Sequence, residues 1–342
     1  MQVSIKDIAA QAGVSVATAS RALSDHPGLE VAQSTRDRIR RFAVNLGYEP
    51  NRLARGLQAR STKIIGVLIG DIRNPYFAGM LEIAEDLAIT AGYQVIADTT
   101  IRSAQPLAKT RFDGWPLDGV LMWATSNTTA ATILRREQLP TVYMGYTRPD
   151  NADYVALDRF GGAKDLVNHL IGQGYRRIAY LTPDAAGVAT IPDDRLLGYT
   201  QACDENGIEP WIISPMQPGS IGSISVTGGR RSDGFAAGVE LAELPEQERP
   251  EAIFCYNDVI ALGMREGLLS AGLRIPSDIA LAGCDGIEEG LYLSKPLTSI
   301  ETPVDLMCRT AIRFLVERMT GGADKPPQQI VLPTSLRIGG TT

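Results

Sequence analysis

Two groups of side chains in this sequence have the types and spacing for binding chemistry, and the first lies near the N-terminus. Val16 and Ala17 begin a run of small residues, and Arg21 follows Ala17 by one helical turn. An arginine can donate to both O6 and N7 of guanine, whereas valine and alanine can contact the methyl group of thymine. Hydroxyl side chains in the same run suit phosphate oxygens, at Ser15, Thr18 and Ser20.

The second group consists of polar side chains that each come directly after a predicted strand, at Asp71, Tyr146, Asn257, Asp258 and Asp285. Ligands of parallel sheets bind beyond the carboxyl ends of the strands, so these side chains mark a candidate ligand site. Two of them have a structural alternative, because Asp258 can cap the helix that follows it and Asp71 can stabilise a loop turn.

The charge of the chain is unevenly distributed. Residues 1–63 carry ten Lys or Arg and five Asp or Glu, although the whole chain has a net charge of −6. Many of the positive charges lie close together, at Arg36, Arg38, Arg40, Arg41, Arg52, Arg55, Arg60 and Lys63. A basic head on an acidic body indicates that the head binds a polyanion; a three-helix bundle without a ligand is the alternative.

The first residues predict two short helices joined by a tight turn. Ser4 and Asp7 resemble a capping box at the start of the first helix, and Gly13 ends it. Ser15 is the candidate N-cap of the second helix. This arrangement is typical of a helix-turn-helix, whose second helix enters the major groove of DNA.

A third helix is predicted to start near Ser34, where Ser34 and Asp37 form another box-like pair, and to end at Gly47. Pro50 cannot lie inside this helix.

The linker that follows has two interpretations. Asn51 can cap a short helix that carries Ala54 and Leu57, and it is a further candidate for a phosphate contact. Such a helix is too short to be stable alone, and Gly56 weakens it further. Either the segment is a flexible linker, or it folds on DNA and inserts an apolar wedge into the minor groove.

The remainder of the chain, from residue 62 onward, alternates predicted strands with predicted helices. Strand-like runs include "KIIGVLIG", "YQVIAD", "DGVLMW", "TVYMGY", "RIAYLT", "AIFCYND" and "IALAGCD". This alternation is typical of a parallel, doubly wound α/β sheet. The predicted fold is an N-terminal all-α helix-turn-helix domain followed by an α/β body.

Several classes of site are not indicated by the sequence. It has no GxSxG motif, no lysine directly after a glycine and no GxGxxG after a strand, and its only histidines are His26 and His169. We therefore expect no enzyme activity, no cofactor and no metal site. The four cysteines form no CxxC pair and are expected to be reduced and buried. The absence of a long apolar run and of an N-terminal signal pattern predicts a cytoplasmic protein.

Nine motifs spread over the chain are shared with one known family. They are "IKDIAAQAGVSVATASRAL", "GYEPNRLARGL", "IIGVLIGDIRNPYF", "LDGVLMW", "GYRRIAYLT", "RLLGYTQACDENGI", "FCYNDVIALGMREGL", "IPSDIALAGCDG" and "PLTSIETP". With these motifs the chain resembles the LacI/GalR family of transcriptional regulators over essentially its whole length. Two stretches, "RLLGY" and "DIRNPYF", also resemble a CytR-like branch. The resemblance implies a regulator, by family default a repressor, that reads a pseudo-palindromic DNA operator.

The resemblance also assigns roles in the head. It implies that Val16, Ala17 and Arg21 occupy base-reading positions. It further implies that Leu57 matches the hinge leucine that intercalates at the operator centre, with Ala54 beside it in the minor groove.

For the body, the resemblance implies a periplasmic-binding-protein-like fold of two subdomains joined by three crossovers, with a small-molecule effector in the cleft between them. Arg195, Asn257 and Asp285 match positions that commonly contact the effector, and Asp71 lies in the first cleft loop. A surface salt bridge is the alternative role for Arg195. Phe77, Tyr146 and Phe160 can stack on a sugar ring or belong to the core. This set suits a polyhydroxylated ligand, so a sugar or sugar derivative is expected, and a nucleoside is the alternative.

The sequence departs from the family pattern at several places. Gly145 stands where many members have a polar cleft residue, and no second aspartate follows Asp285. Residues 101–119 are irregular where a helix is usual, and residues 214–234 resemble a loop. The tail has no leucine heptad, which predicts a dimer rather than a tetramer.

The predicted domains are the helix-turn-helix at 1–49, a hinge at 50–61 and the effector-binding and dimerisation domain at 62–342. Subdomain one is expected at about 62–158 and 290–321, and subdomain two at about 159–289 and 322–342. Three other classes of protein are alternatives: an enzyme with a DNA-binding head, a solute-binding transport protein and a DNA-binding protein without an effector. The absence of catalytic motifs argues against the enzyme. The absence of a signal pattern and the presence of a basic head argue against the transport protein. A body that responds to no ligand would favour the DNA-binding protein without an effector.

Overall fold

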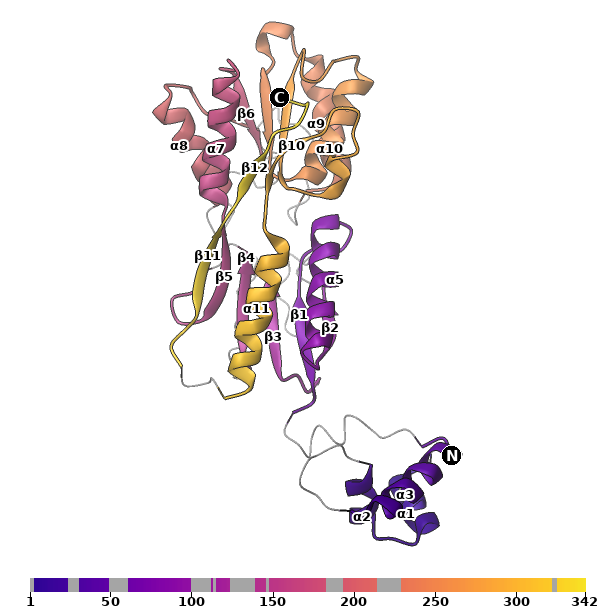
Figure 1. Ribbon diagram of the computed structural model, residues 1–342. Coiled ribbons are helices and arrows are strands. Elements are labelled where there is room, and N and C mark those ends of the chain that lie inside the picture. The colour runs from indigo at the N-terminus through magenta and orange to yellow at the C-terminus, as the bar shows by residue number, and fades with distance from the viewer. Residues whose placement is uncertain are drawn as a thin grey trace. The chain divides into compact units, whose positions relative to one another are not determined.

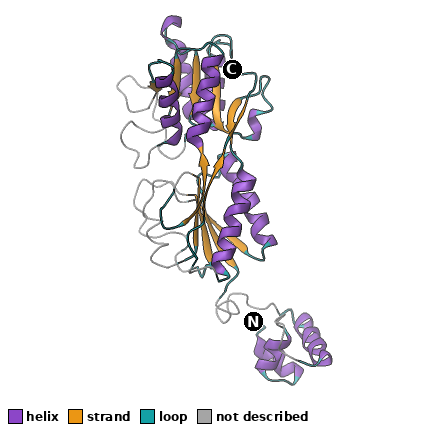
Figure 2. Cartoon of the chain, turned by 60° about the vertical axis from the view of Figure 1, so that its left-hand side comes forward, coloured by secondary structure: helices purple, strands orange, loops and turns teal. Residues whose placement is uncertain are grey.

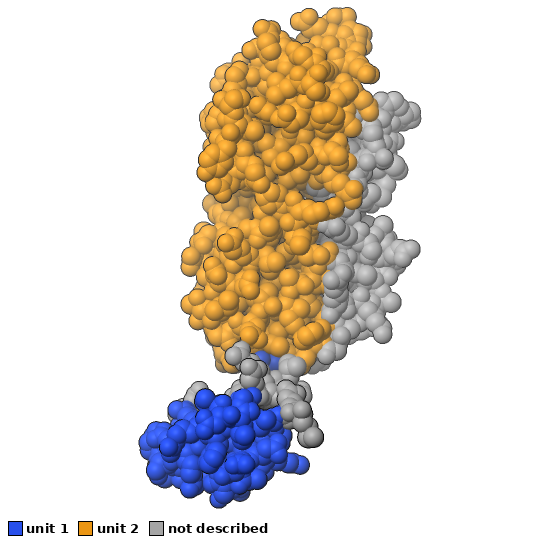
Figure 3. Space-filling view, turned by 90° about the vertical axis from the view of Figure 1, so that its right-hand side faces the viewer, with its two compact units in different colours: residues 1–62 blue, residues 63–342 orange. Residues whose placement is uncertain are grey.

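The computed structural model describes most of the chain and divides it into two compact units, Met1–Thr62 and Lys63–Thr342 (Figure 3). The described residues are 3–23, 31–48, 61–99, 112, 115–123, 139–145, 148–182, 193–213, 229–321 and 325–342. Residues 50–60 of the hinge and residues 214–228 therefore lie outside the described residues.

The N-terminal unit contains the three predicted helices, α1 (Ile5–Ala12), α2 (Val16–Ala22) and α3 (Gln33–Asn45). The Ser4 backbone N–H and hydroxyl both donate to the Asp7 carboxylate, at 2.8 and 2.7 Å. Gly13 ends α1 in the left-handed conformation, with φ of 62°, which glycine adopts without strain. The predicted capping and turn of the helix-turn-helix are therefore confirmed. A small apolar core holds the unit together, formed by Ile8, Ala12, Ala22, Ile39 and Ala43.

The predicted start of the third helix was only approximate. The N-cap of α3 is Ala32, and Asp37 accepts a hydrogen bond from the Gln33 side chain at 3.0 Å, so no Ser34–Asp37 capping box forms. Because the helix begins at Gln33, Ser34 lies inside its first turn and not at the N-cap that a capping box requires.

The body contains two six-stranded sheets, as a doubly wound α/β fold predicts. The first sheet has the order β11-β5-β4-β3-β1-β2 and the second β12-β10-β9-β8-β6-β7. All neighbouring strands are parallel except β10 and β12. The first sheet's strands are β1 (Ile64–Leu68), β2 (Gln94–Asp98), β3 (Gly119–Trp123), β4 (Thr141–Gly145), β5 (Asp153–Asp158) and β11 (Gln329–Pro333). Those of the second are β6 (Ile178–Leu181), β7 (Trp211–Ile213), β8 (Ala252–Cys255), β9 (Ala280–Asp285), β10 (Thr298–Glu301) and β12 (Ser335–Arg337).

Helices cover these sheets and define two lobes. The helices are α5 (Pro75–Thr90), α7 (Arg159–Gly172), α8 (Asp194–Glu205), α9 (Arg231–Glu243), α10 (Asp258–Ser270) and α11 (Val304–Met319). The first lobe is the first sheet with α5 and α11, which lie side by side on one face although they are far apart in sequence (Figure 1). The second lobe is the second sheet with α7 and α8 on one side and α9 and α10 on the other (Figure 1). Figure 2 shows helices packed around the strands of this lobe.

The chain passes between the lobes three times, after β5, after β10 and between β11 and β12. Two of the expected subdomain boundaries were wrong. Strand β10 pairs with β9 in the second sheet, and β11 pairs with β5 in the first. The crossovers therefore lie closer to the C-terminus than expected, because the strand partners of these two segments are distant in sequence.

In the second lobe, α9 and α10 pack so closely that their backbones touch. A Cβ atom at Gly263 would lie 1.9 Å from the Arg231 carbonyl oxygen, and one at Gly267 would lie 2.2 Å from the Phe235 carbonyl oxygen. Glycine is therefore required at this crossing for steric reasons.

The four cysteines, Cys203, Cys255, Cys284 and Cys308, are free thiols and buried, as predicted. Within the described residues, the helices lack the combination of length and apolar character that a membrane span needs.

Candidate functional site

The predicted base-reading residues lie on the exposed surface of α2. Val16 is 44% exposed, and the side chains of Ala17 and Arg21 are exposed as well. Ala17 and Arg21 are four residues apart and share one helix face. The buried residues Ala19 and Ala22 fix the opposite face against the core of the unit. The structure therefore brings the three residues to one accessible surface, on which they can contact DNA.

The predicted phosphate-contact residues have different surroundings. Ser15 is the N-cap of α2, and its hydroxyl accepts from the Thr18 backbone N–H at 3.1 Å. The two hydroxyls of Ser15 and Thr18 lie 2.8 Å apart, and Ser20 is half-buried. Asn51, Ala54 and Leu57 lie outside the described residues.

Helix α3 adds positive charge to the unit. Arg38, Arg40 and Arg41 are exposed, whereas Arg36 is half-buried. Exposed arginines of this kind increase the affinity for the phosphate backbone regardless of base sequence.

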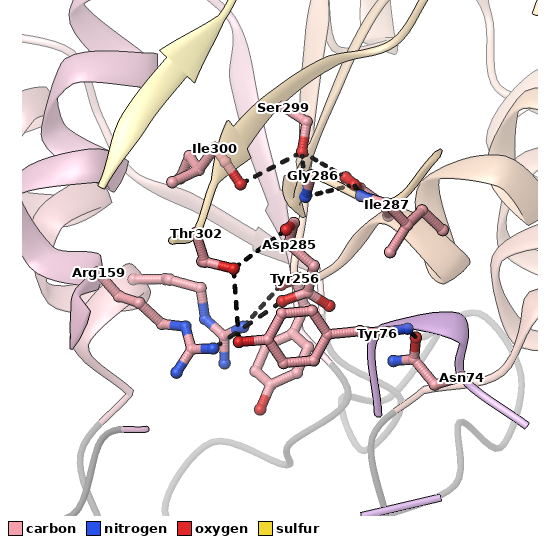
Figure 4. Close-up of polar contacts among 12 residues, drawn as sticks. Asn74, Tyr76, Arg159, Tyr256, Asp285, Gly286, Ile287, Ser299, Ile300 and Thr302 are labelled. Carbon is pink, nitrogen blue, oxygen red and sulfur yellow. Dashed lines mark hydrogen bonds and ion pairs between the residues drawn. The ribbon is translucent and has the colours of Figure 1, made fainter. Parts of the chain in front are cut away.

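The second candidate site lies in the body at the carboxyl ends of strands from both sheets, since Trp123 ends β3, Arg159 follows β5 and Asp285 ends β9. Figure 4 shows polar contacts among its residues. The Thr302 hydroxyl connects the lobes: it lies 3.4 Å from the Tyr76 hydroxyl at the start of α5 and donates to the Asp285 carbonyl oxygen at 3.2 Å. We call this set the lobe junction; its members are Asn74, Tyr76, Trp123, Arg159, Arg195, Tyr256, Asp285 and Thr302.

Arg195 enters the lobe junction from the first turn of α8. It is 5% exposed, its Nε donates to Asp193 at 3.0 Å, and its Nη1 donates to the Tyr256 carbonyl oxygen at 2.9 Å. The guanidinium carbon lies 3.5 Å from the centre of the Tyr256 ring. Asp193 also accepts from the Tyr180 hydroxyl at 2.5 Å. Arg195 therefore forms an ion pair with Asp193. The alternative role was a surface salt bridge, but this ion pair is buried inside the lobe junction.

Asp285 ends β9 and faces the first lobe. Its φ of 123° is in a region that residues with side chains rarely adopt, and such strain is common at functional sites. Burial raises the pKa of this carboxyl to about 7, against the opposing effects of Arg159, Arg195 and a hydrogen bond from Asn74. Its Oδ1 lies 3.9 Å from Nη2 of Arg159.

Asn257 and Asp258 both have structural roles at the start of α10, and a contact of Asn257 with an effector stays a prediction. Asn257 caps α10, since its Oδ1 accepts from the Ile260 N–H at 2.9 Å. The prediction that Asp258 caps this helix was wrong. Asp258 is the first helical residue, and it accepts from the Gly286 and Ile287 N–H groups at 2.8 and 2.9 Å. It thereby fixes the turn that holds Asp285, and Ser299 also donates to it at 2.7 Å.

The raised pKa of Asp285 predicts a pH dependence of stability. In the folded protein this carboxyl keeps its proton up to about pH 7, whereas its ordinary pKa is 3.8. Its contribution to stability is therefore complete at low pH and is lost as the pH rises through about 7. We expect the free energy of unfolding of Asp285→Asn, relative to wild type, to increase between pH 5 and 8, as measured by urea denaturation.

Asp278→Asn is the control for this prediction. Hydrogen bonds from the Arg274 side chain and backbone lower the pKa of Asp278 to about 2, so this group does not titrate between pH 5 and 8. Its difference from wild type should stay constant over that range. A constant difference for Asp285→Asn as well would contradict the predicted titration.

Aromatic rings form the first-lobe wall of the lobe junction. The rings of Tyr76, Phe77 and Trp123 meet edge to face, with centroids 5.3 to 5.6 Å apart. Phe77 is partly buried against the core of the first lobe. A Cβ atom at Gly145, whose φ is 96°, would lie 2.9 Å from the Trp123 ring, which explains the glycine at this position. Tyr146 lies outside the described residues, and Phe160 is half-buried.

Asp71 is engaged by its own loop. Its Oδ1 accepts from the Arg73 N–H at 2.9 Å, and its carboxylate pairs with the Arg73 guanidinium at 2.7 Å. Asp71 therefore stabilises a loop turn, which is its structural alternative, and its contact with an effector stays a prediction.

Sequence reasoning missed several members of the lobe junction. Arg159 follows β5 directly, is 2% exposed and has its guanidinium 5.2 Å from the Trp123 ring centre. The signal for it was an arginine immediately after the strand-like run "DYVALD". The involvement of Asn74, Tyr76, Trp123 and Thr302 depends on how the two lobes meet, which no local pattern contains.

The edge of the lobe junction carries one further ion pair between the lobes. Arg148, in the loop after β4, lies 3.3 Å from Asp194 at the start of α8. Both side chains are partly exposed, so this contact contributes little on its own.

Comparison with known proteins identifies relatives over nearly the whole chain. Residues 4–51 match the model for bacterial regulatory proteins of the lacI family, and residues 167–342 match that for a periplasmic binding protein-like domain. The HTH-type transcriptional repressor CytR of Escherichia coli strain K12 is 32% identical over 325 residues, covering 93% of this chain and 90% of CytR.

Two solved structures are similar in fold. The lac repressor dimer bound to operator and the anti-inducer ONPF has a TM-score of 0.81 at 23% identity. The match covers 100% of this chain and 99% of the repressor chain. The transcriptional regulator CelR–cellobiose complex has a TM-score of 0.66 at 27% identity, with 100% of both chains covered.

Proposed function

The chain belongs to the LacI family of bacterial regulatory proteins, and we propose that it is a repressor that responds to a sugar or sugar derivative at the lobe junction. As a member of this family it is a DNA-binding transcriptional regulator controlled by a small-molecule effector, and not an enzyme. We further propose that it acts in the cytoplasm, as a homodimer that reads a pseudo-palindromic operator.

On the DNA side, the proposal assigns the base contacts to Val16, Ala17 and Arg21, whose side chains are exposed on α2. Phosphate contacts are assigned to Ser15, Thr18, Ser20 and Asn51, and the minor-groove contacts to Ala54 and Leu57 of the hinge. Residues 1–49 then read the operator, residues 50–61 form the hinge, and residues 62–342 bind the effector and the second subunit.

The observation that carries the effector proposal is the lobe junction itself. It combines the buried donor Arg195, the polar groups Asp285 and Asn74, and the aromatic rings of the first lobe at the carboxyl ends of both sheets. Polar groups next to aromatic faces suit a ligand with hydroxyl groups and an apolar ring face. The cellobiose complex of the related regulator CelR agrees with a sugar.

A nucleoside is the second candidate effector. The partly buried ring of Phe77 lies against the buried rings of Tyr76 and Trp123, and a nucleobase can pack beside it. The alignment with CytR covers 93% of this chain at 32% identity. A regulator without an effector is the remaining alternative.

The proposal is tested with the full-length chain in two steps. An operator is first selected from random DNA, and a symmetric site is expected from a dimer. Thermal unfolding is then followed with sugars, sugar derivatives and nucleosides, since a ligand of the native state raises the apparent stability. A stabilising compound should also change operator affinity.

Arg195→Gln should lose about tenfold or more in affinity for that compound while keeping its operator affinity. Arg313→Gln, at an exposed ion pair on α11, is the matched control and should behave as wild type. An operator affinity that no compound alters would contradict effector control. Undiminished affinity in Arg195→Gln would contradict the assignment of the site.

A further inference from the structure

The chain enters the body at Lys63, and this residue has an unusual backbone conformation. Its φ is 60°, and among the described residues only Lys63 and Asp285 combine a positive φ with a side chain. Such values carry a steric cost that the surroundings must offset, and they are common at functional sites. Asp285 belongs to the lobe junction, whereas Lys63 is the first residue of the body unit, close to the end of the proposed hinge.

Contacts from both neighbouring strands hold Lys63 in this conformation. Its backbone N–H donates to the carboxylate of Asp118, just before β3, at 3.0 Å. Its carbonyl oxygen accepts from the N–H of Gln94, at the start of β2, at 2.8 Å. The Lys63 ammonium lies 4.5 Å from the centre of the buried Tyr93 ring and 3.4 Å from the Tyr93 hydroxyl. We call Lys63, Tyr93, Gln94 and Asp118 the hinge anchor.

The hinge anchor is attached to the amino end of the first sheet. Strand β1 begins at Ile64, directly after Lys63, and lies between β2 and β3. The Asp118 N–H donates to the Ile64 carbonyl oxygen at 2.8 Å, so Asp118 is itself held by β1. Tyr93 belongs to the core of the first lobe. The hinge anchor therefore moves as a part of the first lobe.

The sign of φ at Lys63 determines the direction in which the chain leaves the sheet toward the hinge. A change from 60° to an ordinary negative φ rotates the preceding residues about the N–Cα bond by roughly 120° or more. The N–H of Lys63 rotates with them and turns away from Asp118. The hydrogen bond to Asp118 therefore favours the positive φ, and with it one direction of the chain.

We propose that the hinge anchor fixes the direction in which the hinge leaves the body, and that the operator affinity of the dimer depends on this direction. The inference rests on the proposed function, since it concerns how a dimer reaches both halves of its operator. Two heads bind two half-sites at the same time only if both linkers allow it geometrically. Lys63 and Asp118 are then positioning residues, which act on DNA binding through the chain that they orient.

Two substitutions of Lys63 test the sign of φ, and both remove the ammonium group. Asparagine tolerates a positive φ, whereas a β-branched valine does not. The full-length variants are compared by fluorescence anisotropy at one salt concentration on two duplexes. One carries the symmetric operator selected from random DNA, and the other carries one half-site beside scrambled sequence. Circular dichroism and thermal unfolding show whether each variant is folded.

Lys63→Asn is expected to keep most of the wild-type affinity for the symmetric operator, and Lys63→Val to lose about tenfold or more, because its two heads no longer reach both half-sites together. The two variants should bind the half-site duplex similarly, because a single head binds it without the second. A loss confined to the symmetric operator distinguishes an effect on hinge direction from general destabilisation.

A second pair of variants changes the partner of the Lys63 N–H and decides the question if Lys63→Val does not fold. Asp118→Ala removes the acceptor and should lose affinity for the symmetric operator but not for the half-site duplex. Asp118→Asn keeps an oxygen that can accept from the N–H, so it should retain more of the affinity. Equal affinities of the two Asp118 variants for the symmetric operator would contradict the role of this hydrogen bond.

Two outcomes with folded Lys63 variants overturn the inference. If Lys63→Val binds the symmetric operator as tightly as Lys63→Asn, the sign of φ does not determine operator affinity. If Lys63→Val loses affinity equally for both duplexes, the substitution does not act through the direction of the hinge. The wild-type protein tests the proposed function separately. If it does not prefer the symmetric operator to the half-site duplex, it does not read the operator as a dimer, and the inference fails with that proposal.

Discussion

Arg21→Ala is expected to reduce the ratio of specific to non-specific DNA affinity by about 5- to 150-fold. The reason is that a bidentate arginine–guanine contact contributes about 1–3 kcal/mol of discrimination, and alanine cannot replace it. The exposed position of Arg21 on the Ala17 face of α2 gives the guanidinium access to a base edge. Fluorescence anisotropy with the selected operator and a scrambled duplex, at one salt concentration, measures the ratio.

Arg41→Ala is the matched control, because it removes the same charge from an exposed position on α3 of the same unit. A phosphate contact weakens binding to all sequences similarly, so this variant should change both affinities and leave their ratio nearly constant. If Arg21→Ala behaves in the same way as Arg41→Ala, the base-reading role of Arg21 is wrong.

Gly263→Ala is expected to destabilise the body by about 3 kcal/mol, at the upper end of the usual cost of overpacking. Its Cβ would lie 1.9 Å from the Arg231 carbonyl oxygen and 2.9 Å from the Phe235 nitrogen, and both are backbone atoms. Helices α9 and α10 would have to separate, and the buried contacts between them would be lost. Urea denaturation of the full-length chain, followed by circular dichroism, measures the change.

Gly172→Ala, the last residue of α7, is the control substitution. A Cβ atom there meets nothing within 4 Å, and alanine favours a helix over glycine by up to about 1 kcal/mol. Gly172→Ala should therefore be neutral or slightly stabilising. Equal effects of the two substitutions would show that the close approach of α9 and α10 does not limit stability.

The helix-turn-helix could be predicted in detail because its determinants are local. Ser4, Asp7, Gly13 and Ser15 act within four residues of their partners, and each was found in its predicted role. The start of α3 was less exact because its N-cap is Ala32, which has no side-chain cap hydrogen bond for a sequence pattern to indicate.

The doubly wound body could be recognised from alternating strands and helices, but the lobe to which each strand belongs could not. Strands β10 and β11 lie in the opposite lobes from those expected. Strand β10 pairs with β9, and β11 pairs with β5. Packing between segments that are distant in sequence determines these pairings, and no local feature of β10 or β11 specifies its sheet.

The lobe junction was predictable only in part. Arg195 and Asp285 were found from motif positions and strand ends, and both are buried there. The cap of α10 is Asn257 and not Asp258, since two adjacent polar residues at a helix start compete to be the cap. Arg159 directly follows the strand-like run "DYVALD" and could have been included on that ground, whereas its contact with Trp123 joins the ends of β5 and β3 and has no local signal.

Reciprocal binding measurements on the full-length chain test the central claim most directly. The operator dissociation constant is measured with and without the stabilising ligand, and the ligand dissociation constant with and without operator. If the lobe junction controls DNA binding, thermodynamic linkage requires the two affinities to change by the same factor, typically about 5- to 150-fold. A ligand that binds equally well to free and operator-bound protein would contradict effector control through the lobe junction.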